Sequence, residues 1–335
     1  MSLPAHWFTP PDRPGLRARL LTPWAHWRAH WRARGGRVRG EGWRAPVPVI
    51  SVDALAAGGV GPLPAVLAIV GHVQGLGIQP VILARGGSGP LRIEPRRNGA
   101  AEVGAAALLA ADFAPTWGAP DWASGARAAL AEGGADCLVM MGGLRDPALV
   151  KDVSIGVVDA VRGFGNGRCR PAGPLAEPLA VALARVDLLI PIGPRSAQER
   201  FAELWRARLD MPRMPGDLQP LPTGMEWAGA RLLAFAGGED PELFFATLRG
   251  LGAEPVRCEA LATEEAYGAG LLARLEREAY LRAAQLVTTE EDAVRLPEAF
   301  RRKVLSLPMR LNLPDKAPLD AALTRVGLRQ GGGVS

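Results

Sequence analysis

The chain has 335 residues, of which 48% are apolar and 22% charged, and its formal net charge is +5. These proportions are typical of a soluble, globular protein and predict no disorder outside the ends of the chain. The three scattered cysteines, Cys137, Cys169 and Cys258, predict neither a disulfide framework nor a zinc site. No apolar run approaches the roughly 20 residues that span a bilayer, and no secretion signal is evident, so we expect a reducing, cytosolic environment.

Residues 1–45 form a basic, Trp-rich segment that is expected to be helical and amphipathic. Residues 1–50 contain nine Arg against Asp12 and Glu41, a net charge of +7. At about 100° per residue, one stripe collects five apolar side chains: Leu16, Leu20, Trp24, Trp27 and Trp31. Arg28 and Arg32 flank this stripe, and Thr22-Pro23 predicts a break into two helices, with Thr22 as the cap of the second.

Two interpretations of this segment are open. A stripe of Trp between Arg residues is typical of a helix that lies on an anionic membrane surface. The alternative is a helix packed on the protein. No nucleic-acid partner is expected, because no motif that reads nucleic acid accompanies the positive charge.

The next feature is a glycine-rich loop between a strand at residues 47–52 and a helix that begins near residue 65. Gly58, Gly59 and Gly61 have the spacing of a loop that cradles phosphate, but Pro62 and Leu63 stand where such a loop has Lys and Ser or Thr. Proline also removes a backbone N–H group that a phosphate would use. The chain has only three lysines, none of them near this loop.

Further apolar runs at residues 80–84, 137–141, 155–158 and 186–192 alternate with helical patterns and predict a mostly parallel α/β sheet over residues 46–210. Prolines in residues 211–226 predict a linker. Runs at residues 231–236, 254–261 and 285–288 predict a second, smaller α/β domain over residues 227–326, and residues 327–335 are expected to be a disordered tail.

Several segments, spread over nearly the whole chain, give it a resemblance to a known family. They are residues 47–52 with the glycine loop, Ile82-Leu83-Ala84-Arg85-Gly86, residues 101–104, 163–168, 171–175, 177–178, 244–249, 288–290 and 292–293. The chain resembles tetraacyldisaccharide 4'-kinase of lipid A biosynthesis. The resemblance implies a P-loop-NTPase-like fold, ATP and magnesium as cofactors, and the lipid A disaccharide precursor as substrate. It also implies a peripheral position at the cytoplasmic face of the bacterial inner membrane.

The departures from the family pattern fall on polar positions. Where the family has Gly-Lys-Thr, this chain has Gly61-Pro62-Leu63, and where it has Asp-Asp-Gly, this chain has Met140-Met141-Gly142. Gly-Asp-Glu-Pro becomes Gly-Ala-Ala-Ala at residues 104–107, and the Arg before Glu177 becomes Ala176. Thioether sulfur is a poor ligand for magnesium. We therefore expect no metal site and no bound cofactor.

Two positions could still supply acid-base chemistry. Asp121 matches the family's catalytic Asp, and Glu264 falls where the family has a His. Asp292 is retained from the family's Thr-Glu-Lys-Asp, but its Lys has become Glu291. Arg85, Asn166, Arg168 and Glu177 are candidates for binding substrate or phosphate, although such residues also stabilise strand-to-helix turns.

Three hypotheses follow from these residues. The first is a catalytically impaired pseudokinase of the tetraacyldisaccharide 4'-kinase family. The second is an active kinase with a remodelled site, in which Arg85, Arg145 or Arg168 replaces the lost cations. The third is a different enzyme that uses Asp121, Glu264 and Glu265 as acid-base groups. Protein partners stay open.

Overall fold

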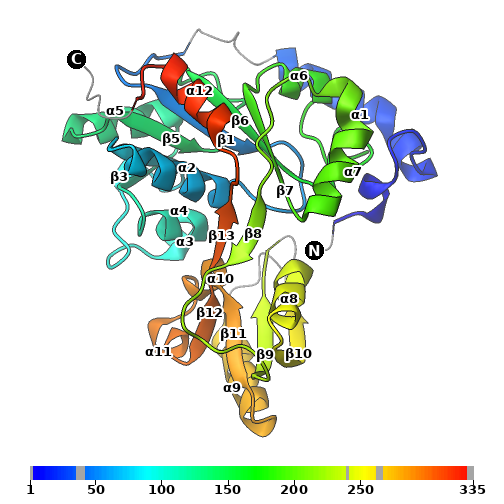
Figure 1. Ribbon diagram of the computed structural model, residues 1–335, viewed down its shortest axis with the longest axis vertical. Helices are drawn as coiled ribbons and strands as arrows, with labels where there is room; N and C mark the ends of the chain where they lie inside the picture. The colour runs from blue at the N-terminus through cyan, green and yellow to red at the C-terminus, as the bar shows by residue number, and fades with distance from the viewer. Residues whose placement is uncertain (1–2, 35–41, 239–240, 262–266, 330–335) are drawn as a thin grey trace.

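The structure, a computed structural model, describes residues 3–34, 42–238, 241–261 and 267–329, with the side chains of residues 26–34 left out. It consists of a broad lobe and a smaller, elongated lobe, joined by two strands (Figure 1). Both lobes have helices packed on sheets that are parallel or, in the broad lobe, mostly parallel, so the predicted α/β class with a mostly parallel sheet is confirmed. In the described part of the chain, no helix is long and apolar enough to cross a membrane.

The broad lobe is built on a seven-stranded sheet of order β3-β4-β2-β5-β1-β6-β7, in which only the β3–β4 pair is antiparallel. The strands are β1 (Val49–Ala54), β2 (Pro80–Arg85), β3 (Leu91–Arg92), β4 (Thr116–Ala119), β5 (Cys137–Met141), β6 (Val153–Asp159) and β7 (Leu188–Ile192). In register, Ile50 of β1 lies opposite Val139 of β5 and Val153 of β6. Parallel strands end at one edge, so the loops after β1, β5 and β6 meet there.

Successive residues of each strand face opposite sides of the sheet, and the two sides carry different helices. Ile50 and Val139 pack toward α2 (Leu63–Gly75), α4 (Ala105–Ala110) and α12 (Ala317–Arg325). Val49 and Met140 pack toward α5 (Trp122–Glu132). Further along, α6 (Leu179–Leu183) and α7 (Arg195–Trp205), followed by η2 (Arg206–Arg208), join a third apolar cluster, and the short α3 (Ala100–Val103) precedes α4. The sheet is therefore covered on both faces.

The N-terminal segment contains η1 (Ala5–Phe8) and α1 (Leu16–Arg34). The predicted break at Thr22-Pro23 is wrong, because α1 continues through Pro23 as one helix of 19 residues. Thr22 Oγ1 donates a hydrogen bond to the Ala18 carbonyl, at 2.6 Å, in place of capping a new helix. Ala18 and Ala25 are both buried, and Ala25 packs with Cys169 and Ala172, so contacts on both sides of the proline keep the helix in one piece.

The Pro-rich residues 211–226 contain β8 (Asp217–Pro220), which pairs with β13 (Met309–Asn312) in an antiparallel ribbon between the lobes (Figure 1). The division of the chain into domains stays a prediction. The structure adds that Leu311 and Leu319, which fall within the expected second domain, pack in the core of the broad lobe. Leu328, which falls in the expected tail, is buried in the same core.

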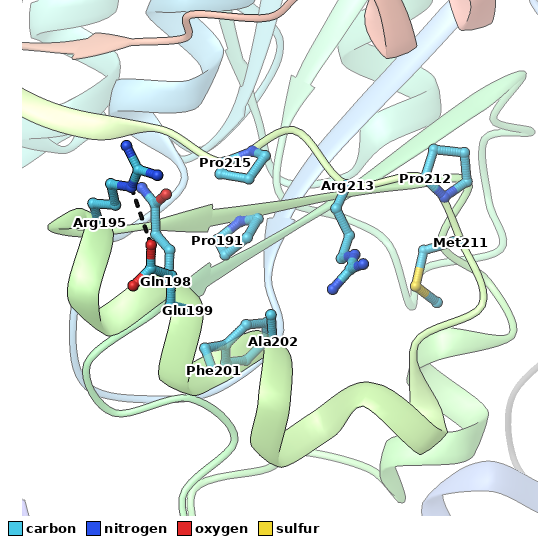
Figure 2. Close-up of a pocket in the computed structure, with 10 residues that line it drawn as sticks. All are labelled: Pro191, Arg195, Gln198, Glu199, Phe201, Ala202, Met211, Pro212, Arg213 and Pro215. Atoms are coloured by element: carbon cyan, nitrogen blue, oxygen red, sulfur yellow. Dashed lines mark hydrogen bonds and ion pairs between the residues drawn. The ribbon is translucent and has the colours of Figure 1, made fainter.

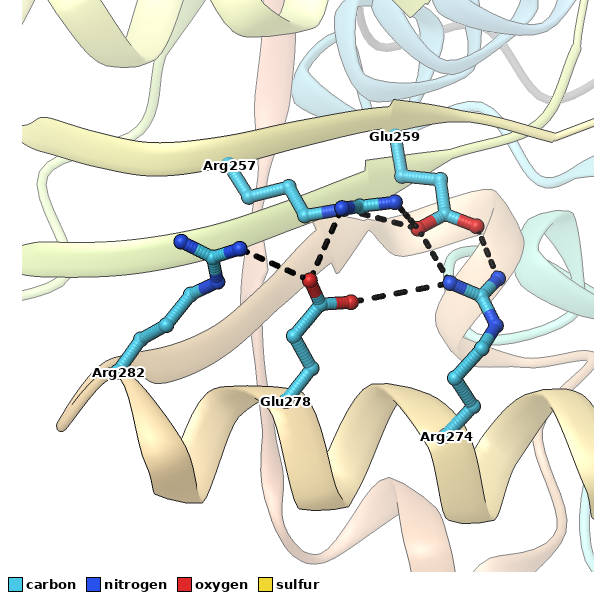
Figure 3. Close-up of polar contacts among 5 residues, drawn as sticks. All are labelled: Arg257, Glu259, Arg274, Glu278 and Arg282. Atoms are coloured by element: carbon cyan, nitrogen blue, oxygen red, sulfur yellow. Dashed lines mark hydrogen bonds and ion pairs between the residues drawn. The ribbon is translucent and has the colours of Figure 1, made fainter.

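The small lobe has a four-stranded parallel sheet of order β10-β9-β11-β12. Its elements are β9 (Arg231–Ala236), α8 (Pro241–Gly250), β10 (Glu254–Ala260), α9 (Ala269–Leu281), β11 (Gln285–Thr289), α10 (Glu290–Ala293), α11 (Glu298–Arg301) and β12 (Val304–Leu307). Five alternating charges join the edge strand β10 to α9 (Figure 3). In this network Arg257 bonds both Glu259, at 3.2 Å, and Glu278, at 2.9 Å, which fixes the helix against the strand.

Candidate functional site

The loop between β1 and α2 turns through two glycines with positive φ angles. Gly58 and Gly59 have φ angles of 82° and 124°, in the region that favours glycine. A Cβ atom at Gly59 would lie 2.5 Å from Asp159 Oδ2 at the end of β6, whereas a Cβ atom at Gly61 would meet nothing within 4 Å. The loop therefore depends on glycine where it passes β6.

The two residues that close the loop belong to the fold of α2. Pro62 occupies the N-cap position and has no backbone N–H group to donate. Leu63, the first residue of the helix, is 8% exposed and packs in the core of the broad lobe. At these two positions the structure has an apolar ring and a buried aliphatic side chain, so neither side chain supplies a cation or a hydroxyl group to a ligand.

A cavity of about 350 Å³ lies beside this loop. One wall consists of small and apolar loop residues between Ala54 and Pro62, together with Pro174 and Ala176. The other walls carry four charged side chains, which are Arg145, Arg170, Glu291 and Arg295. The last two, with Gly238, come from the small lobe, so both lobes contribute to the cavity. This size is in the range of small-molecule sites.

Asp53 is a candidate that the sequence analysis missed. It lies near the end of β1, and its Oδ2 accepts a hydrogen bond from the Leu144 N–H at 3.0 Å. Burial raises the pKa of this carboxyl, while the Leu144 N–H and Arg145 oppose the shift. An Asp directly after an apolar strand run was the signal available in the sequence. A carboxyl with a raised pKa beside a cleft is typical of acid-base sites, although structural groups also show it.

Glu177, a predicted site residue, lines a second, very small cavity together with Asp53 and Arg145. This cavity has a volume of about 10 Å³, close to the space that one water molecule needs. Glu177 also accepts a hydrogen bond from Arg185, at 2.5 Å. The structure therefore brings Glu177 to the edge of the loop site but pairs it with Arg185, which follows α6.

Asp121 and Arg85 lie apart from the cavity beside the loop and do not line it. Asp121 is the N-cap of α5, where its Oδ1 accepts from the Ser124 N–H at 2.9 Å. The Ser124 hydroxyl, followed by the Ser124 N–H, lowers the pKa of Asp121. Arg85, at the end of β2, donates to the Pro120 carbonyl at 2.9 Å and approaches Asp146 at 3.7 Å. Both residues have structural partners.

Asn166 and Arg168 organise the loop after β6. The Asn166 amide is buried and donates to the carbonyls of His6, at 2.9 Å, and Ala172, at 2.8 Å. Its Oδ1 accepts from the Arg168 N–H at 3.1 Å. The Arg168 guanidinium donates to the Thr22 hydroxyl of α1. These contacts join the loop to the N-terminal segment and do not direct either side chain into the cavity.

The apolar stripe of α1 is described only in part. Leu16, Leu20 and Trp24 are 74%, 72% and 51% exposed, respectively. The side chains of Trp27, Arg28, Trp31 and Arg32 lie outside the described part of the chain, although α1 itself extends over these positions. Glu264 and Glu265 also lie outside the described residues.

The residues at the family's magnesium position do not fit that ion. Met140 is fully buried against α5, and a Cβ atom on Gly143 would lie 2.6 Å from its methyl group. Within the described ranges, no group of three or more His, Cys, Asp or Glu side chains could hold a metal. Magnesium requires oxygen ligands, and at this strand end the structure presents thioether groups that pack in the core.

A larger cavity, of about 490 Å³, lies at the edge strand β7 of the broad lobe's sheet, between β7, α7 and residues 211–215 (Figure 2). Its lining includes Pro191, Phe201 and Arg213, with the Arg195–Glu199 pair of α7 at 3.0 Å on its rim. Among the described residues, none of the site residues predicted from the sequence lines it.

Comparison with known proteins identifies the family. Residues 18–327 match the family model described as Tetraacyldisaccharide-1-P 4'-kinase. A protein of Dinoroseobacter shibae named tetraacyldisaccharide 4'-kinase is 48% identical over 96% of this chain and 97% of its own length. A protein of Jannaschia sp. with the same name is 44% identical over 97% and 99% of the two chains.

The fold is also that of a solved structure. The crystal structure of LpxK from Aquifex aeolicus in complex with ATP covers 93% of this chain and 99% of its own, with a TM-score of 0.71 and 19% identity. This likeness confirms the P-loop-kinase-like fold, and the sequence matches settle the family. The chain belongs to the tetraacyldisaccharide 4'-kinase family.

Proposed function

We propose that this chain is a catalytically impaired member of its family, which binds the lipid A disaccharide precursor but transfers phosphate to it poorly. The observation that carries the proposal is the pair Pro62 and Leu63, a ring without an N–H group and a side chain buried in the core. Phosphoryl transfer depends on positioned cations and metal ions. The proposal includes no resident magnesium ion, because Met140 packs in the core where a ligand is needed.

We place the chain at the cytoplasmic side of the bacterial inner membrane, as a peripheral protein. Leu16, Leu20 and Trp24 support this placement, because α1 exposes them while it packs on the protein through Ala18 and Ala25. Exposed Leu and Trp on a helix with Arg nearby favour an anionic lipid surface.

A second candidate is an active tetraacyldisaccharide 4'-kinase with a remodelled site. The names of the relatives favour this candidate, since each of the two proteins above is named as the kinase. Arg145 is the structural observation that supports it, because this cation lines the cavity beside the loop.

Transfer of labelled phosphate from ATP to the lipid disaccharide tests the proposal, with the Dinoroseobacter shibae relative as the positive control. We expect a rate about a thousandfold below that of the relative, since loss of one stabilising donor alone costs about 10²–10³ in rate. A rate within tenfold of the control would overturn the proposal and establish the second candidate.

Flotation with vesicles that contain anionic phospholipid tests the membrane placement. We expect Leu20→Glu to reduce the bound fraction several-fold, because it places a negative charge in the apolar stripe. Leu281→Glu is the matched control, since Leu281, the last residue of α9 in the small lobe, is 75% exposed. Equal binding of both variants and the parent would contradict the placement.

A further inference from the structure

We propose that the cavity beside the loop binds a phosphate group through Arg145, Arg170 and Arg295, without a metal ion. The inference deepens the proposed function and rests on it, because it assigns a ligand chemistry to the same cleft. The ligand class is an organic phosphate, carried either by a nucleotide or by the phosphorylated disaccharide lipid.

The first argument is the convergence of positive charge from three separate segments. Arg145 follows β5, Arg170 lies in the loop after β6, and Arg295 follows α10 in the small lobe. Against these three cations, Glu291 is the one carboxylate among the described residues that line the cavity, which gives the lining a net charge of +2. A concave site of one sign attracts ligands of the other.

The second argument is that two of the three guanidinium groups remain available to bind a ligand. Arg145 and Arg170 are exposed, and within the described ranges neither forms an ion pair with a carboxylate. Arg170 lies over the ring of Trp7, with 5.8 Å to the ring centroid, which orients its side chain without neutralising its charge. Arg295 lies 3.5 Å from Glu291, so this cation is already partly paired.

The third argument is that the other arginines suggested by the sequence have different partners. Arg85 donates to Pro120 and does not line the cavity. Arg168 donates to Thr22 of α1. Of the three substitute cations considered from the sequence, the structure therefore selects Arg145 and adds Arg170 and Arg295 from segments distant along the chain.

The apolar wall of the cavity favours binding of phosphate by the arginines without a metal ion. Loop residues such as Leu55, Val60 and Pro62 exclude water from one side, and charges interact more strongly in such surroundings. Guanidinium groups bind phosphate oxygens in pairs and need no bridging ion. Binding through these groups is thus independent of magnesium, unlike binding through a loop with Lys and Thr.

Calorimetric titration of the full chain with ATP and with inorganic pyrophosphate, in EDTA and again in magnesium, tests the inference. We expect EDTA to leave the Kd within about twofold, and each of Arg145→Gln and Arg170→Gln to weaken binding about tenfold, the scale of one charge-assisted contact. Arg145→Lys should restore part of the affinity. Arg96→Gln, at an exposed position that does not line the cavity, is the control.

The same titration with the disaccharide lipid, with and without its phosphate, distinguishes the two sources. Binding of ATP alone assigns the site to a nucleotide, and binding of the phosphorylated lipid alone assigns it to the lipid; both outcomes support the inference when the Gln variants weaken them. Binding that requires magnesium, or that the Gln variants leave unchanged, overturns it. The transfer assay tests the proposed function separately. A rate within tenfold of the relative's overturns the proposed function and leaves the result of the titration unaffected.

Discussion

Two loops meet at the carboxyl edge of the broad lobe's sheet, residues 55–62 after β1 and residues 160–178 after β6. They touch directly, because the Ala57 N–H donates to the Pro174 carbonyl at 3.1 Å. The first loop has the glycine spacing of a phosphate site, but its last residue, Pro62, is the N-cap of α2, and the next residue, Leu63, packs in the core. The second loop keeps polar residues such as Asn166, which hydrogen-bonds to other parts of the protein.

The difference teaches that a motif's backbone shape and its chemistry depend on different residues. Glycine and apolar packing maintain the first loop without any phosphate-binding side chain. In the second loop, Asn166 and Arg168 contribute to the resemblance with the family but contact η1, α1 and neighbouring carbonyls. A polar residue in a motif is therefore a functional candidate only after its structural contacts are known.

Gly59→Ala should break the first loop and has the largest expected effect on stability. The substitution places a methyl group 2.5 Å from Asp159 in a backbone conformation with φ of 124°. We expect the free energy of unfolding to fall by about 3 kcal/mol, from strain and overpacking together.

Gly61→Ala is the control in the same loop, because a Cβ atom there meets nothing within 4 Å. We expect a change of no more than about 0.5 kcal/mol in urea unfolding. If both variants lost equal stability, the close approach to Asp159 would not explain the glycine at position 59.

Asn166→Ala should break the second loop. It removes the amide that donates to His6 and Ala172 and leaves those carbonyls without this donor. We expect a loss of about 2 kcal/mol, the cost of unsatisfied buried polar groups, measured by urea unfolding. Asn312→Ala, at an exposed position of β13, should change stability by less than about 0.5 kcal/mol. A stable Asn166→Ala protein with weakened phosphate binding would instead assign Asn166 to the ligand.

Asp121 is another motif residue with a structural contact, and its variants have the smallest expected effect on stability. Asp121→Ala removes the N-cap of α5 and should cost about 1 kcal/mol at neutral pH, whereas Asp121→Ser retains a capping oxygen and should cost less. Ser124 lowers the pKa of the folded Asp121 below its ordinary value of 3.8. The stabilisation is therefore present above that value and is lost as the pH falls through the folded pKa.

Thermal unfolding between pH 2 and 6 measures this dependence. The difference between the parent and Asp121→Ala should shrink at the acid end, where the capping carboxylate becomes protonated. An Asp121→Ser protein that is as stable as the parent but loses residual transfer activity would show that Asp121 has a role beyond the cap.

Much of the fold could be predicted from local patterns. The strand expected at residues 137–141 is β5, with the same bounds, and the runs at residues 80–84 and 155–158 lie within β2 and β6. Apolar runs of this length indicate buried strands, because a strand covered on both faces needs apolar residues in succession. β8 and β13 could not be predicted this way, because their pairing joins residues such as Leu218 and Leu311, far apart in the chain.

The sequence by itself determined the α/β class, the family and the absence of Lys and Thr at the end of the glycine loop, because these properties reside in composition, order and spacing. The tertiary structure decided which charged residues share a site. It separated Asp121 and Arg85 from the loop, paired Arg168 with α1, and brought Arg145, Arg170 and Arg295 to one cavity. Convergence of this kind depends on the packing of distant segments, and no local pattern records it.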